Sequence, residues 1–297
     1  MLKVLLMGIF FKTIYHALAR TTGPLGGIRP RRIYDILARR AFHHPEYEVF
    51  TNRWGDELLL SHFYHIDRNI LIFGTYDLDL HLGLQRLLKP GMVAFDVGAN
   101  LGEMALHMAR LVGSGGQVWA FEPVPAIHQR LLGHIQRNNV GNIIHAVDLA
   151  LSDQTGAAAL AAPDEHADNQ GLGSIANLTA KAGPVRTTIP TITLDDFVAQ
   201  HGISRIDLMK IDIQGAEPKL IAGGTQTLSR FAPDLLMEFS PDDLRHTGTT
   251  SRDLAVQLSE LGYQIHALIK EGIGPAIEIQ SLPLDFAATN VLCRKRR

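Results

Sequence analysis

The middle of the chain alternates short apolar runs with amphipathic segments, in the order that builds a parallel sheet covered by helices. The expected elements are strand 92–97, helix 103–112, strand 117–121, helix 125–138, strand 143–151, helix 194–201, strand 206–211, a short helix from 217 and strand 235–239. A polar, Ala/Gly-rich stretch at 157–188 interrupts the pattern. Because crossovers between parallel strands are right-handed, we expect one continuous sheet on both sides of this interruption.

Local signals define both ends of the alternation. Residues 76–88 should form a helix that stops before Lys89-Pro90-Gly91, because the residue before a proline avoids helical geometry. Residues 251–261 are amphipathic, with Ser251 as the expected N-cap. Strands 264–269 and 290–293 follow with no room for a crossover helix, so they should form an antiparallel hairpin. The segment 58–73 fits either strands or a helix with a strand.

A glycine-containing turn follows the first expected strand, where residues 95–102 read FDVGANLG. Gly98 allows the backbone to turn sharply into a helix that opens near Gly102, which is the geometry of a nucleotide-binding turn. Glu122 ends the next apolar run, where a carboxylate accepts hydrogen bonds from both hydroxyls of a ribose. The sequence therefore predicts half of a nucleoside pocket.

The acidity of the turn favours a nucleoside without phosphate. A dinucleotide turn needs glycine at its first, third and sixth positions, which are Gly98, Asn100 and Glu103 here. Asp96 and Glu103 would repel a diphosphate at the helix N-terminus. S-adenosylmethionine has a ribose, no phosphate, and a sulfonium and an ammonium that favour acidic neighbours. A nicotinamide-dependent oxidoreductase is the alternative.

Composition narrows the class of protein. The 297 residues are 46% apolar, enough for one large core with an attached smaller region. The single cysteine, Cys293, excludes a disulfide framework and a cysteine metal site and suggests a reducing compartment such as the cytoplasm. A net charge of -2 gives no basic face for nucleic acid. The histidines at 43, 44, 62 and 65 lack further ligands at suitable spacing, so we expect no metal site.

Positive charge is concentrated at the start of the chain. Residues 1–40 contain eight Lys or Arg against the single acid Asp35. Their apolar run at 4–11 is too short to span a bilayer. Two interpretations remain: a helix that contacts the anionic inner face of a membrane, or a helix packed on the domain or on a second subunit in a homo-oligomer. We divide the chain into a helical, basic extension at 1–75 and a main domain at 76–297.

Six ordered segments give the chain a resemblance to the FkbM family of methyltransferases. They are VAFDVGANLG at 93–102, VWAFEP at 118–123, ALSD at 150–153, ITLD at 192–195, LMKIDIQGAE at 208–217 and PDLLME at 233–238. The resemblance implies the class I methyltransferase fold, a Rossmann-like α/β sheet of seven mostly parallel strands ending in an antiparallel hairpin. It also implies S-adenosylmethionine as cofactor and methylation of a hydroxyl on a sugar, glycan or secondary metabolite.

Matching these segments to the chemistry gives a set of expected cofactor contacts. Asp96, Gly98, Ala99, Asn100 and Gly102 should line the methionine end, Glu122 and Pro123 the ribose, and Asp148 or Asp153 the adenine.

Methyl transfer to an alcohol needs an aligned acceptor and a base. The expected catalytic residues are Asp212, Glu217 and Glu238, with Lys210 as an electrostatic partner. Each carboxylate also has a structural interpretation: Asp212 capping the turn that follows, Glu217 in the first turn of a helix, and Glu238 in a buried pair with Lys210.

Acceptor contacts are expected from Asn169 and Ser174, in a lid-like loop at 161–186, and from Gln214. The family has Glu where this chain has Gln214, and a neutral amide cannot act as a base. A non-catalytic S-adenosylmethionine-binding partner subunit is therefore a further alternative.

Overall fold

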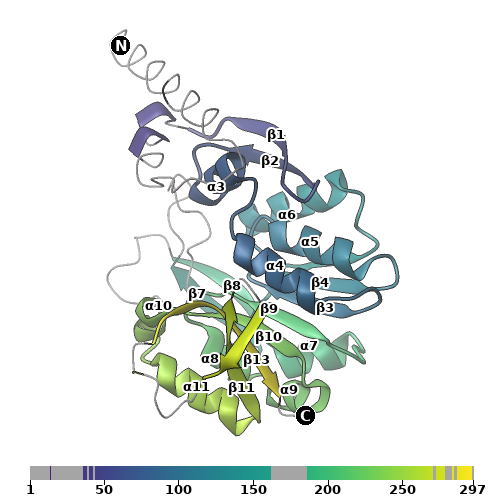
Figure 1. Cartoon of the computed structure of the whole chain (residues 1–297), viewed down its shortest axis with the longest axis vertical. Coiled ribbons are helices and arrows are strands. Elements are labelled where there is room, and N and C mark those ends of the chain that lie inside the picture. The colour runs from purple at the N-terminus through teal and green to yellow at the C-terminus, as the bar shows by residue number, and fades with distance from the viewer. Residues whose placement is uncertain are drawn as a thin grey trace. The chain divides into compact units, whose positions relative to one another are not determined.

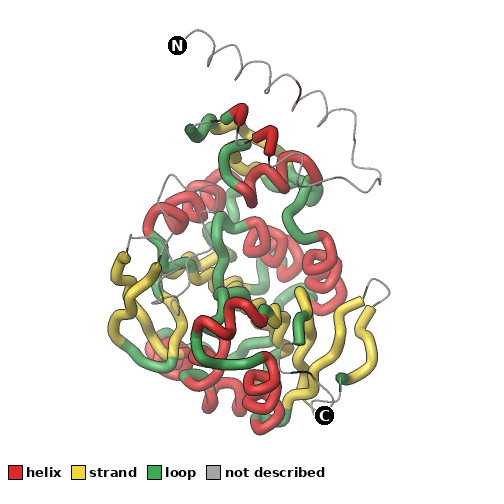
Figure 2. The backbone as a smooth tube through the Cα atoms, turned by 90° about the vertical axis from the view of Figure 1, so that its left-hand side faces the viewer, coloured by secondary structure: helices red, strands yellow, loops and turns green. Residues whose placement is uncertain are grey.

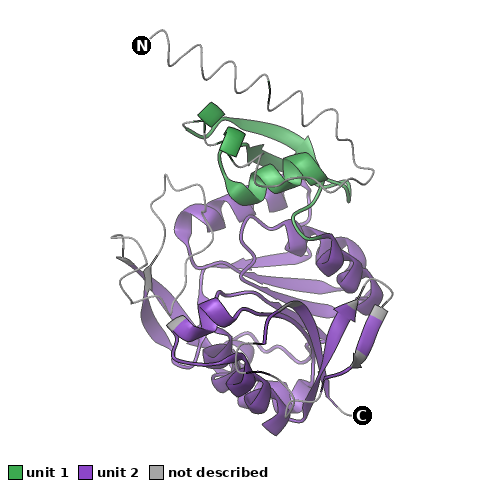
Figure 3. Cartoon of the chain, turned by 60° about the vertical axis from the view of Figure 1, so that its left-hand side comes forward, with its two compact units in different colours: residues 1–77, 164–170 green, residues 78–163, 171–297 purple. Residues whose placement is uncertain are grey.

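The computed structural model describes residues 14, 36–38, 40–42, 44–161, 186–269, 272–277, 283 and 286–295. The chain divides into two compact units, residues 1–77 with 164–170 and residues 78–163 with 171–297 (Figure 3). Most of the basic segment 1–40 and the two loop residues Asn169 and Ser174 lie outside the described part. Among the described residues, no helix has the length and apolarity to cross a membrane.

The smaller unit contains a hairpin and a helix. Strand β1 (Tyr47–Thr51) pairs antiparallel with β2 (Glu57–Ser61), and helix α3 (His65–Phe73) follows. Asn52 closes the hairpin turn, because its side-chain oxygen accepts hydrogen bonds from the backbone N–H groups of Trp54 and Asp56. The open segment 58–73 is thus a strand and a helix.

The larger unit is built on an eight-stranded sheet in the order β12-β11-β13-β10-β9-β3-β4-β5 (Figure 1). Its five neighbouring parallel strands are β5 (Ile144–Val147), β4 (Gln117–Phe121), β3 (Val93–Val97), β9 (Leu208–Ile211) and β10 (Asp234–Phe239). Strands β11 (Tyr263–Ile269), β12 (Gly272–Ala276) and β13 (Ala288–Lys295) are antiparallel to their neighbours. The mostly parallel α/β sheet predicted from the sequence is confirmed.

Helices cover both faces of this sheet (Figure 2). One face carries α4 (Leu78–Leu87), α5 (Glu103–Val112) and α6 (Pro125–Arg137), and the other carries α7 (Leu194–Gln200), α8 (Glu217–Ala222), α9 (Thr225–Phe231) and α11 (Ser251–Glu260) (Figure 1). The short helix α10 (Pro241–His246) follows β10. Since the central strands are buried on both faces, they read as continuous apolar runs.

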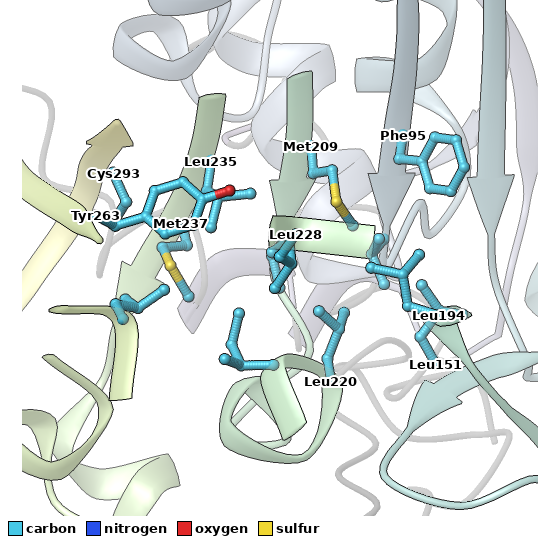
Figure 4. Packing of buried hydrophobic residues seen from close by; sticks show 14 of the residues in the cluster. Phe95, Leu151, Leu194, Met209, Leu220, Leu228, Leu235, Met237, Tyr263 and Cys293 are labelled. Carbon is cyan, nitrogen blue, oxygen red and sulfur yellow. The ribbon is translucent and has the colours of Figure 1, made fainter. Parts of the chain in front are cut away.

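The largest part of the core lies under the second face of the sheet (Figure 4). Phe95, Met209 and Leu235 point from three adjacent strands toward Leu220 of α8 and Leu228 of α9, and all five are fully buried. Each such side chain contributes about 1.5–3 kcal/mol by leaving water. This packing fixes the strands whose carboxyl ends carry the polar residues of the site.

A second sheet of three strands was not expected. Its strands β6 (Ala150–Ser152), β8 (Arg186–Thr193) and β7 (Gly156–Ala161) lie in that order. The predicted single strand 143–151 therefore breaks after Val147 into β5 of the main sheet and β6 of the second. The polar stretch 157–188 also contains strand residues, because β7 gains its order from pairing with β8 and not from its Ala-rich sequence.

Two details of the C-terminal part also differ from the expectation. Thr250, not Ser251, is the N-cap of α11: its hydroxyl accepts a hydrogen bond from the backbone of Asp253, whose carboxylate accepts one from the backbone of Thr250. The antiparallel pairing of β11 with β13 is confirmed. The connection between them contains β12, which pairs with the outer edge of β11 and raises the strand number from seven to eight.

Candidate cofactor site and catalytic loop

The glycine turn after β3 is packed so closely that its glycines cannot be replaced without movement. Gly98 has φ +78°, and a Cβ atom there would lie 2.0 Å from the carbonyl oxygen of Asp212. Gly102, the N-cap of α5, has φ +96°, and its Cβ would lie 2.5 Å from Leu131. The turn is therefore a cradle of bare backbone between β3, the end of β9 and α6.

Lys210 is the cation at the centre of this region. The register of the parallel strands places it opposite Asp96 on β3 and Leu236 on β10. Its Nζ lies 3.1 Å from Asp96 Oδ1 and donates a hydrogen bond to the carbonyl oxygen of Gly98 at 2.8 Å. Burial alone would lower the pKa of Lys210, but attraction by Asp96 and Asp212 outweighs it and raises the pKa. Lys210 therefore stays charged and fastens the turn to β9.

Asp96 presents a buried carboxylate beneath the turn. Its side chain is 0% exposed. Among the described residues, neither carboxylate oxygen meets the distance and angle criteria for a hydrogen bond. The pair with Lys210 neutralises its charge only through a 3.1 Å contact with one oxygen. Because both oxygens are closed to solvent, Asp96 acts on the turn from beneath, through its contact with Lys210.

Glu122 joins the turn to the loop after β4. Its Oε2 accepts a hydrogen bond from the backbone N–H of Asn100 at 3.0 Å, and its Oε1 accepts one from Val124 at 2.9 Å. Burial raises the pKa of Glu122 to about 7. A carboxylate has roughly four acceptor positions, so both oxygens retain capacity for further donors such as ribose hydroxyls.

The two aspartates expected at the adenine lie in different sheets. Asp148 is exposed and directly follows β5, at the same edge of the main sheet as Glu122. Asp153 follows β6 of the three-stranded sheet and accepts a hydrogen bond from Ser152 Oγ at 3.0 Å. Asp148 is therefore the better placed of the two.

The candidate catalytic loop runs from Asp212, at the carboxyl end of β9, to Glu217, the first residue of α8. The backbone N–H of Asp212 donates to the carbonyl oxygen of Val97 at 3.0 Å, which continues the strand pairing into the loop. Asp212 Oδ1 accepts a hydrogen bond from Gln214 Nε2 at 2.9 Å, and Oδ2 lies 3.9 Å from Lys210 Nζ. The side chain of Asp212 is 38% exposed, so an incoming molecule can reach it.

Glu217 occupies a position that favours its structural interpretation, whereas Glu238 does not form its expected pair with Lys210. Glu217 is buried as the first residue of α8, and its Oε1 accepts a hydrogen bond from the backbone N–H of Ile213 at 3.1 Å. Burial raises the pKa of Glu217 to about 7. Glu238 is half-buried in β10. The buried ion pair expected for Lys210 is made with Asp96 instead of Glu238, because the register places Asp96 directly opposite.

One residue that supports the turn was not singled out by sequence reasoning. His134 of α6 is buried, and its Nδ1 donates a hydrogen bond to the carbonyl oxygen of Leu101 at 2.7 Å. Its signal in the sequence is a polar residue on the apolar face of a helix, in line with Ile127 and Leu131.

Geometry and charge together suit one kind of ligand. A bare glycine cradle beside a buried carboxylate and a second carboxylate after the next strand fit a cationic nucleoside without phosphate. Among the described residues, no group of three or more His, Cys, Asp or Glu could hold a metal ion. Together with the mostly parallel sheet in which β13 lies antiparallel between β10 and β11, this site defines a class I methyltransferase, which uses S-adenosylmethionine.

Comparison with known proteins assigns the family. Residues 96–265 match the Methyltransferase FkbM domain, and the chain belongs to this family. It is 30% identical over 162 residues to the 31-O-demethyl-FK506 methyltransferase FkbM of Streptomyces tacrolimicus, covering 46% of this chain and 60% of that protein. It is 30% identical over 176 residues to the 2-O-methyltransferase NoeI of Sinorhizobium fredii, covering 52% of this chain and 67% of that protein. The oxidoreductase alternative is thereby dropped.

Among solved structures, the chain is similar to a methyltransferase FkbM from Methylobacillus flagellatus, at 16% identity and a TM-score of 0.42. That match covers 77% of this chain and 54% of the other.

Proposed function

We propose that the protein transfers the methyl group of S-adenosylmethionine to a hydroxyl oxygen of a sugar, glycan or secondary-metabolite acceptor. The observation that carries the proposal is Asp212, a reachable carboxylate held directly beside the glycine turn. The two relatives named above are described as O-methyltransferases, which supports oxygen as the acceptor atom.

Each residue has a definite role in this proposal. When bound, S-adenosylmethionine supplies an electrophilic methyl group. Gly98 and the bare backbone of the glycine turn receive its methionine end, and Glu122 accepts the ribose hydroxyls. Asp212 accepts the proton of the acceptor hydroxyl, which increases the nucleophilicity of the oxygen. Because Asp212 is 38% exposed, it can return this proton to water.

Lys210 organises the reaction without contacting the acceptor. By binding Gly98 and Asp96, it fixes the turn relative to the strand end that carries Asp212. Alignment of this kind supplies a large part of the rate enhancement in displacement reactions.

Two measurements separate catalysis from simple binding. The first measurement is calorimetry with S-adenosylhomocysteine, which should show binding to the wild type and to Asp212→Asn. The second measures turnover as the S-adenosylhomocysteine formed from the methyl donor in the presence of each of a panel of hydroxylated acceptors. We expect Asp212→Asn to lower turnover by about 10²–10⁴-fold, the usual contribution of a general base. Asp79→Asn, at an exposed aspartate in the first turn of α4, is the matched control. Binding without turnover on every acceptor would instead favour the non-catalytic subunit.

The basic segment 1–40 carries a separate proposal, contact with the anionic inner face of a membrane. Cosedimentation with anionic and neutral vesicles should show binding to the anionic ones only, and a chain lacking residues 1–35 should lose it. Equal binding to both would contradict the proposal. Sedimentation of the same two chains would show whether this segment also supports a homo-oligomer.

A further inference from the structure

Gln214 has an unusual backbone conformation and a specific side-chain contact. It has φ +53°, the left-handed region that non-glycine residues seldom adopt, and Gly215 follows with φ +92°. Its Nε2 donates a hydrogen bond to Asp212 Oδ1 at 2.9 Å. An ionised carboxylate only accepts hydrogen bonds, so the amide must present its NH₂ group here. The strained backbone thus directs a donor at the reactive carboxylate.

The rest of the loop keeps Gln214 in this place. Ile213 is fixed through its N–H bond to the Glu217 carboxylate. A Cβ atom at Gly215 would lie 2.5 Å from the carbonyl oxygen of Asp243, so α10 closes against the backbone next to Gln214. Strained residues persist only where their surroundings over-determine them, and they concentrate at functional sites.

The two oxygens of Asp212 have different neighbours. Oδ1 binds the amide of Gln214, and Oδ2 faces the ammonium of Lys210 at 3.9 Å. The ammonium in turn is shared with Asp96, which lies closer to it. The amide of Gln214 is thus the partner that fixes the rotation of the Asp212 carboxylate.

We propose that Gln214 is a positioning residue for methyl transfer, which orients Asp212 and keeps it the single carboxylate offered to the acceptor hydroxyl. This inference rests on the proposed function of Asp212. An acid at position 214 would place a second carboxylate within hydrogen-bond distance of Asp212. Two such groups share one proton, so Asp212 becomes available as a base only at a higher pH.

The charged groups around the loop come from four elements. Asp96 on β3 and Lys210 on β9 act on Asp212 directly, and Glu217 on α8 lies close enough for its pKa to respond to Asp212. Asp243 on α10 accepts a hydrogen bond from Ser240 Oγ at 2.6 Å. None of these residues is replaced in the variants below, and the swapped pair keeps one carboxylate in the loop, so its charge matches that of the wild type.

The first test uses the protein without ligand. Urea denaturation is measured at pH 5 and pH 8 for the wild type, Gln214→Glu, Gln214→Met and the swapped pair Asp212→Asn with Gln214→Glu. Crowded carboxylates favour the protonated form, so Gln214→Glu should lose stability as pH rises. Between pH 5 and pH 8 we expect the urea midpoint of Gln214→Glu to fall by about 0.5–1 M more than that of the wild type. Gln214→Met and the swapped pair should keep the wild-type pH dependence.

The second test measures methyl transfer. In Gln214→Glu the acidic limb of the kcat/KM profile should move up by about one pH unit. Gln214→Met should lower kcat about tenfold, through misalignment, and leave the limb in place. A merely structural role would lower the rate without moving the limb.

The outcomes separate this inference from the proposed function. An unchanged pH dependence of Gln214→Glu, in stability and in rate, would overturn the role of Gln214. A wild type that binds the methyl donor and methylates nothing would overturn the proposed function, while the denaturation comparison would still decide whether Gln214 and Asp212 are in contact.

Discussion

Replacement of Gly98 by alanine tests the arrangement on which the whole site depends. The carbonyl oxygen of Asp212 lies 2.0 Å from the position of the new Cβ, and real Cβ atoms do not approach closer than about 3.0 Å. The turn and the end of β9 must therefore separate by roughly 1 Å, which as overpacking costs about 1–3 kcal/mol. The left-handed φ of +78° adds about 1–2 kcal/mol for any residue with a side chain.

Gly248 provides a matched control. Its φ of +77° imposes nearly the same backbone penalty, and a Cβ there would meet nothing within 4 Å. Urea denaturation should give a loss of about 1–2 kcal/mol for Gly248→Ala and about 2–5 kcal/mol for Gly98→Ala. Calorimetry with S-adenosylhomocysteine should show unchanged affinity for the control and at least about a tenfold loss for Gly98→Ala, because displacement of the turn misaligns the cradle.

Equal destabilisation of the two variants would refute this reasoning. It would mean that the backbone of the turn does not approach Asp212, and the placement of the base beside the cofactor turn would fall with it. A large loss of stability in Gly98→Ala with unchanged affinity would refute only the role of the turn in cofactor binding, and its packing against Asp212 would stand.

Three further results are expected. Lys210→Met should lower the free energy of unfolding by about 3–5 kcal/mol, because it leaves the buried carboxyl group of Asp96 without its cation. Adding Asp96→Asn should recover most of the loss, and strictly additive effects would contradict the pair. Burial raises the pKa of Glu122 to about 7, so its contribution to stability is complete below pH 4.5 and is lost as pH rises through 7. Between pH 5 and 8 the ligand-free wild type should lose about 2.5 kcal/mol more than Glu122→Gln, and parallel curves would contradict the shift. Thr250→Ala should cost about 1 kcal/mol in thermal or urea denaturation through loss of the cap on α11, and a neutral effect would argue against the capping box with Asp253.

Elements with strong local signals could be predicted from the sequence almost residue by residue. Helix α5 and strand β4 have the predicted bounds, because Gly102 and Gly113 delimit the helix and the strand is a continuous apolar run. Strands β6 and β7 lack such signals, and the Thr- and Ile-rich sequence of β8 is interrupted by Pro190. Strand β7 is largely alanine, and pairing across more than 20 intervening residues provides what its side chains do not.

The candidate site divides in the same way. The positions of Gly98 and Glu122 at strand ends follow from the motif and its spacing. The ion-pair partner of Lys210 could not be predicted from the motif, because the pairing depends on which strands flank β9 and on their register. The contact between Gln214 and Asp212 depends on a left-handed backbone that the sequence pattern does not signal.

The insertion of β13 between β10 and β11 has a consequence for synthesis of the protein. Strand β13 hydrogen-bonds to both neighbours, so its position in the sheet stays open until residues 288–295 have left the ribosome. Until then two long rows of backbone donors and acceptors remain exposed on the nascent chain, which are the surfaces on which strands from different molecules join. Translation that stalls between β12 and β13 should therefore yield aggregation-prone chains, even though every residue of the cofactor turn and catalytic loop has already been made.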